Sequence, residues 1–163
     1  MALIIEDGSG VPGANSYNSV TEIRTYASAR GIMLPTADED VEVLAVQATD
    51  YLETFRNDYQ GKKTEITQDL QFPRTGVVIE DYDVPSNEIP KLLKQAHAQA
   101  AGEAYEQDLL PNKAQVAKKE KVDVIEVEYQ ETSTSIVGFP KVDALLEPLF
   151  KSSSGWPIKV VRA

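Results

Sequence analysis

The chain has 163 residues, is 42% hydrophobic and carries 26 acidic against 16 basic residues, for a net charge of −10. This length suffices for one compact domain with a core, and the absence of cysteine excludes a disulfide framework and a Cys-ligated zinc site. Because non-specific nucleic-acid binding depends on Lys and Arg that neutralise phosphates, the composition argues against a general nucleic-acid binder. No apolar run approaches the roughly 20 residues of a membrane span, and the start lacks the pattern of a signal peptide, so we expect a soluble, cytosolic protein with no membrane contact.

The first 56 residues are predicted to form an N-terminal arm followed by two helices. Residues 1–18 hold a short strand-like run, "LIIE", and a loop rich in Gly, Pro and Asn. The first helix is expected to begin at Ser19, which has capping-box spacing to Glu22, and to stop at Gly31. The second is expected over residues 38–56 with an acidic first turn. The buried faces are predicted to comprise Val20, Ile23, Tyr26 and Ala27 in the first helix, and Val41, Leu44, Ala45, Ala48, Leu52 and Phe55 in the second.

Residues 57–87 form a long connection in which helical periodicity is lost. Thirty residues without regular structure are unusual inside a compact domain, so we expect a functional loop, a pair of short strands, or both, with "TGVVIED" as the β-like part. A third helix is predicted from Glu88 and Ile89 to about Leu110, with Pro90 in its first turn. Its Ala-rich middle suits close packing against another helix.

The clearest strand signal in the chain is "KVDVIEVEYQ", residues 121–130. Ile125, Val127 and Tyr129 alternate with polar residues, as in a half-buried strand. Val122 and Val124 have the opposite phase, which indicates a bulge or a change of apolar face. "ETSTSIVG" follows as a second, weaker strand or a flexible return, so residues 117–137 are predicted to form a hairpin arm.

The last predicted helix starts at Pro140, and Pro148 is expected to kink or end it. Residues 151–163 follow as a tail with a serine-rich linker. The inward face of this helix is predicted to comprise Val142, Leu145, Leu146 and Leu149.

These elements predict a single, mainly α domain over residues 1–163. A small four-helix core (residues 19–56 and 88–150) carries an extended β-hairpin, a long loop, and N- and C-terminal arms. Strands on such arms have unpaired backbone groups, which arms of identical subunits would satisfy. Head-to-tail pairing of this kind closes into a ring, so the residues favour a subunit of an assembly.

Groups that would indicate an enzyme are sparse, and we expect neither catalysis nor a cofactor. His97 is the single histidine and is predicted to pack or lie at the surface. "GSGVPG", residues 8–13, resembles a phosphate loop only weakly and is interpreted as a hinge. The acidic residues of "EDYD", residues 80–83, are interpreted as a solvated loop in preference to a cation site.

Three further features leave alternatives open. Arg74 could clamp a carboxylate of a neighbouring subunit or stabilise its own loop. Trp156 could anchor a docking tail or fold back on its own core. A cluster of lysines is interpreted as part of a solvated arm in preference to a phosphate site; it comprises Lys113, Lys118, Lys119 and Lys121.

The order of several segments resembles a known family across nearly the whole chain. The segments are "MALIIEDGSGVPGANSYNSV", "ATDYLETF", "FPRTGV", "EIPKLLKQA", "KKEKVDVIEVEY" and "FPKVDALLEPLF" with the ending "VVRA". They resemble tailed-phage proteins labelled DnaT-like single-stranded-DNA-binding proteins. Their order is also similar to that of the head-tail connector, or adaptor, proteins that form a ring beneath the portal.

The connector resemblance implies a structural protein of the virion neck, assembled in the host cytoplasm. About twelve copies would form a ring that binds the portal and a tail or stopper protein, with DNA passing through an acidic lumen without specific binding. The resemblance to the DnaT-like single-stranded-DNA-binding proteins implies the alternative function, a DNA-binding accessory protein. By analogy with connectors, the subunit interface would comprise Arg74, Val122, Val124, Ile125, Val127 and Tyr129, and the docking tail Trp156, Ile158, Val160, Val161 and Arg162.

Overall fold

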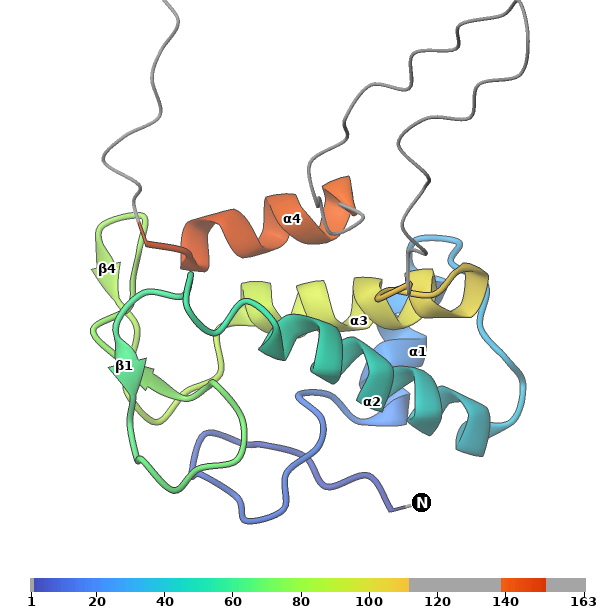
Figure 1. Cartoon of the computed structure of the whole chain (residues 1–163). Helices are drawn as coiled ribbons and strands as arrows, with labels where there is room; N and C mark the ends of the chain where they lie inside the picture. Colours follow the sequence, from blue (N-terminus) through green and yellow to red (C-terminus); the bar gives the residue numbers. More distant parts are fainter. Residues whose placement is uncertain (1, 112–138, 152–163) are drawn as a thin grey trace, which may run out of the picture.

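The computed structural model describes residues 2–111 and 139–151, and the fold they form is mainly α. Four helices make up the body: α1 (Val20–Ser28), α2 (Asp38–Glu53), α3 (Lys91–Glu106) and α4 (Pro140–Leu146). Helix α3 lies in the middle, with α4 along one side and α1 and α2 on the other (Figure 1). The predicted helical core with accessory β-structure is therefore confirmed.

Helix α1 begins and ends as its sequence predicts. The Ser19 side chain accepts the Glu22 N–H, and the Glu22 carboxylate accepts the Ser19 N–H, which completes a capping box. At the other end, the Ile32 N–H donates to Ala27 O at 3.0 Å, across Gly31 with φ of +66°. This is the Schellman closure that a left-handed glycine permits.

Helix α2 supplies much of the core. Val41, Leu44, Ala45, Ala48 and Leu52 are buried as predicted, and Phe55, just past the helix end, is partly buried. The same helix also buries Thr49 and Tyr51. Three acidic residues occupy its first turn, where they complement the helix dipole.

Helix α3 is shorter than predicted. Pro90 is its N-cap residue, outside the first turn, and the helix ends at Glu106, where Gln107 is extended with φ of −157°. The Asp108 carboxylate accepts the Leu110 N–H at 3.0 Å, so this side chain binds the backbone in a non-helical turn. A close approach does occur at Gly102, but to the loop between α1 and α2 and not to a helix: a Cβ added there would lie 2.5 Å from Ile32 Cγ2.

The long connection holds two short antiparallel hairpins at one end of the body (Figure 1). Strand β1 (Lys62–Lys63) pairs with β2 (Arg74–Thr75), and β3 (Val78–Ile79) pairs with β4 (Tyr82–Asp83). The second hairpin lies in the predicted "TGVVIED" region. Its two-residue turn, Glu80 and Asp81, has positive φ at both positions, as a type I′ turn requires.

Helix α4 ends just before Pro148, as the sequence predicts. It ends at Leu146 and continues as the 3₁₀-helix η1 (Glu147–Leu149), which contains the proline. Val142, Leu146 and Leu149 are fully buried and Leu145 is partly buried, as predicted.

The described N-terminal residues, 2–18, do not extend as an arm. Ala14, Ser16 and Tyr17 are buried against the helices, and Ile5 forms an isolated parallel bridge with Ser16. The Tyr17 ring packs edge-on against His97 of α3, and its hydroxyl binds Glu53 of α2 and the Phe72 N–H of the long connection. These contacts hold the segment against the body.

The predicted hairpin over residues 117–137, the tail after Lys151 and the residues assigned to them lie outside the described residues. No helix in the described part of the chain is long and apolar enough to cross a membrane.

Candidate functional site

Most basic side chains in the described part of the chain have partners within the body. Six of the ten described Lys and Arg side chains bind other parts of the body. For example, Arg24 pairs with Asp38 at 2.8 Å and Lys94 with Glu22 at 3.2 Å. The remaining four lie on four separate segments and are exposed, namely Arg56, Lys62, Lys91 and Lys141.

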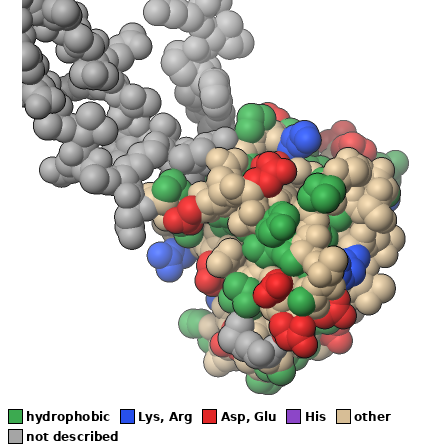
Figure 2. Space-filling view, turned by 90° about the vertical axis from the view of Figure 1, so that its right-hand side faces the viewer, with side chains coloured by type: hydrophobic (Ala, Val, Ile, Leu, Met, Phe, Trp, Pro, Cys, Tyr) green, Lys and Arg blue, Asp and Glu red, His purple; other side chains and the backbone are tan. Residues whose placement is uncertain are grey.

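The body is more acidic than the whole chain. Residues 112–138 and 152–163 hold six of the sixteen basic and five of the 26 acidic residues, which leaves ten basic and 21 acidic residues, a net charge of −11, in the described part. On one face, Lys and Arg side chains are scattered singly among acidic and apolar ones (Figure 2). Such a surface repels phosphate.

The glycine-rich loop of residues 8–13 is filled by a side chain of its own segment. The Glu6 carboxylate is fully buried and accepts the N–H groups of Gly8, Gly10 and Val11, each at 2.9 Å. These N–H groups are the ones that a phosphate-binding loop would offer to its ligand. A carboxylate already occupies that position, so the loop is structural.

Arg74 stabilises its own loop. Its guanidinium donates to Gln60 O at 2.7 Å, Gly61 O at 2.9 Å and Gln71 Oε1 at 2.9 Å, and the side chain is only 6% exposed. The guanidinium also lies 5.9 Å from the ring centroids of both Tyr59 and Phe72. Of the two alternatives left by the sequence, the structure favours the internal one.

His97 lies at the centre of a buried polar cluster. Its Nδ1 faces the Asn18 side-chain amide at 3.1 Å, and its Nε2 is 3.0 Å from both Ala45 O and Thr49 Oγ1. Asn18 Nδ2 also donates to Lys94 O, which orients the amide and assigns the imidazole proton to Nε2. Burial lowers the pKa of His97 to about 4, although the Ala45 carbonyl opposes this shift. Of the two roles predicted for His97, packing or a place at the surface, this position agrees with packing.

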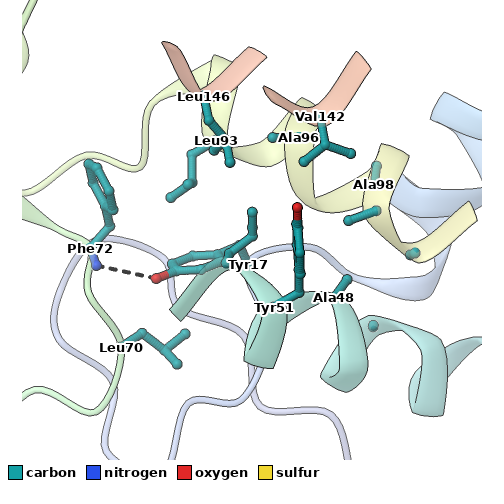
Figure 3. Close-up of a cluster of buried hydrophobic side chains, with 14 of the residues drawn as sticks. Tyr17, Ala48, Tyr51, Leu70, Phe72, Leu93, Ala96, Ala98, Val142 and Leu146 are labelled. Atoms are coloured by element: carbon teal, nitrogen blue, oxygen red, sulfur yellow. Dashed lines mark hydrogen bonds between the residues drawn. The ribbon is translucent and has the colours of Figure 1, made fainter. Parts of the chain in front are cut away.

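A second buried polar cluster was not predicted from the sequence. The Tyr17 hydroxyl donates to Glu53 Oε1 at 2.7 Å and accepts the Phe72 N–H at 3.3 Å, the contact drawn in Figure 3. The Gln71 N–H also donates to Glu53 Oε1. Burial raises the pKa of both Tyr17 and Glu53. The cluster joins the N-terminal segment, α2 and the long connection through residues at least 18 positions apart in the sequence, so no local pattern indicates it.

No group of three or more His, Cys, Asp or Glu side chains among the described residues is placed to hold a metal ion. Glu80, Asp81 and Asp83, the cation site weighed from the sequence, lie at the exposed turn and strand of the second hairpin.

An open groove of about 1180 Å³ lies between α4 with η1 and the start of the long connection. Three acidic residues, Asp58, Asp143 and Glu147, line it, together with Lys151. Burial raises the pKa of Asp143. The other lining residues are small, apolar or amidic, including Ala144, Pro148, Phe150, Asn57 and Gln60.

The described part of the chain is thus a small helical protein with an acidic surface, two buried polar clusters and one acidic groove. The chain belongs to the family described as "Putative DnaT-like ssDNA binding protein", whose model matches residues 1–163. No curated protein and no solved structure matches it. The DnaT-like resemblance read from the sequence is confirmed as family membership, whereas the resemblance to head-tail connectors finds no support in these comparisons.

Proposed function

We propose that this protein is a DNA-binding accessory protein that binds single-stranded DNA. The observation that carries the proposal is the family match across residues 1–163. The protein would act by binding alone, without catalysis or a cofactor.

The described body is a poor surface for phosphates because it has a net charge of −11 and most of its basic side chains have internal partners. The phosphate contacts are therefore assigned to residues 113–121, which hold four lysines and one glutamate. These residues lie outside the described part of the chain, and the assignment rests on their charge.

This assignment sets the salt dependence of binding. Four phosphate contacts on a single strand give a slope of log K against log salt of about −3, from roughly −0.7 per neutralised phosphate. Repulsion from the acidic body weakens binding further, so we expect measurable affinity at low salt and little at physiological salt.

The test compares Lys118→Ala/Lys119→Ala with Lys91→Ala/Lys141→Ala by fluorescence anisotropy on a labelled oligothymidylate. Each variant removes two positive charges. The first removes two of the proposed phosphate contacts, and the second removes two exposed lysines of the body. We expect the first to weaken binding and to reduce the salt slope by about half, and the second to retain the wild-type slope. Equal effects of the two variants would show that the segment is not the binding site.

A second candidate function is favoured by the acidity of the body. In a head-tail adaptor ring, an acidic channel wall lets DNA slide without sticking. We propose this alternative as a ring of identical copies, about twelve by analogy, between portal and tail in the virion neck. Electron microscopy of the protein with and without portal tests it: rings or portal-bound density support the adaptor, and a monomer indifferent to portal contradicts it.

A further inference from the structure

The acidic groove beside α4 lies where the described chain ends. Lys151 lines it, its N–H donates to Asp58 O at 2.7 Å, and its Nζ donates to Asn57 O at 2.9 Å. The preceding residue, Phe150, forms an isolated antiparallel bridge with Tyr59. The chain therefore leaves the body from the wall of the groove, with its last described residues fixed against residues 57–60.

The groove and the residues that follow Lys151 are complementary in charge. Asp58 and Glu147 are exposed at the groove, and Asp143 is half-buried in it. Residues 152–163 carry Lys159 and Arg162 and no acidic residue.

They are complementary in polarity as well. Ala144, Pro148 and Phe150 give the groove an apolar part. Residues 156–161 offer four large apolar side chains, Trp156, Ile158, Val160 and Val161. Tryptophan buries a large apolar area at low entropic cost, which makes it an effective anchor.

We propose that residues 156–162 bind in this groove of their own chain, with Trp156 against its apolar part and the two basic side chains against Asp58, Asp143 and Glu147. Residues 152–155, "SSSG", form the connection. The twelve residues 152–163 span up to about 40 Å when extended. Because Lys151, the residue before them, lines the groove, they can reach any part of it. Attachment to the same chain also raises the effective concentration of the tail at the groove.

DNA and a second copy are the competing occupants. The three carboxylates disfavour DNA because they repel phosphate. A tail from a second copy has the same chemistry but lacks the local concentration that attachment provides. The proposal is independent of the proposed function, since it concerns residues other than 113–121.

Trp156 is the only tryptophan, so its fluorescence in the full-length protein reports this contact directly. We expect emission blue-shifted from that of the unfolded protein and protected from acrylamide. Asp58→Lys/Glu147→Lys, and separately Lys159→Glu/Arg162→Glu, should shift the emission to the red. Combining the two pairs restores opposite charges and should recover the blue shift. The control variant, Glu39→Lys/Glu65→Lys, changes two exposed carboxylates away from the groove and should leave the wavelength of the Trp156 emission unchanged.

The outcomes separate the competing occupants. Wild-type emission equal to that of the unfolded protein overturns the proposal, as does a red shift in the control that matches that of the groove variant. Emission that shifts with protein concentration assigns the groove to the tail of a second copy and overturns binding within one chain. Far-UV circular dichroism on each variant confirms that the helices are retained.

Discussion

At the scale of single residues, His97 makes the stability of the body depend on pH. Its pKa is lowered to about 4, from 6.5, because the ring is fully buried. The unfolded chain therefore binds a proton at a higher pH than the folded protein does. The contribution of His97 to stability is complete above pH 6.5 and is lost as the pH falls from 6.5 towards 4.

We predict that wild-type protein loses about 2 kcal/mol more of its free energy of unfolding between pH 7 and 4.5 than His97→Gln, from roughly 1.4 kcal/mol per pKa unit. Urea unfolding at the two pH values measures this difference, and the variant controls for the carboxylates that titrate in both proteins. NMR titration of the single histidine in the wild type is the independent check. A His97 pKa near 6.5 would contradict the buried cluster.

Arg74 gives the second prediction at this scale. Its replacement by Ala leaves the carbonyls of Gln60 and Gly61 without their buried donor. We expect Arg74→Ala to lower the free energy of unfolding by about 2–4 kcal/mol. The matched control, Arg56→Ala, removes an exposed arginine and should change it by less than about 0.5 kcal/mol. Equal urea midpoints for the two variants would show that Arg74 does not stabilise its loop.

At the scale of the elements, the capping box makes the start of α1 a testable contribution to stability. Ser19→Ala removes the acceptor for the Glu22 N–H. We expect a loss of about 1 kcal/mol in the free energy of unfolding, measured in urea. Thr21→Ala, two residues further on and exposed, is the control and should cost nothing. A neutral Ser19→Ala would mean that the cap does not stabilise the helix.

The elements also show which structure can be predicted from sequence. The caps of α1, the buried face of α2 and the end of α4 at Pro148 depend on residues within a few positions of one another, and each was predicted. The sequence predicts the end of α3 near Leu110, four residues beyond its end at Glu106. The helix ends earlier because the Asp108 side chain competes with it for backbone groups.

Contacts between distant segments were not predictable from such patterns. The N-terminal residues were expected to extend as an arm, yet Glu6 occupies a loop of its own segment and Tyr17 binds Glu53 and Phe72. The internal role of Arg74 could be stated only as an alternative, because its partners are mostly backbone carbonyls, which any sequence provides.

At the scale of the whole molecule, charge is distributed unevenly between the described body and the rest of the chain. The body has a net charge of −11, whereas residues 112–138 and 152–163 together have a net charge of +1. Any binding of DNA by this protein must therefore overcome repulsion by the body. The proposed function requires DNA binding that overcomes this repulsion, whereas the adaptor alternative requires DNA to pass without binding.

The most direct test of the proposed function is the affinity of the full-length protein for a labelled oligothymidylate over a series of salt concentrations. We predict binding at low salt that weakens with a slope of log K against log salt of about −3, from four phosphate contacts. No binding at the lowest salt, from protein shown to be folded, would contradict single-stranded-DNA binding.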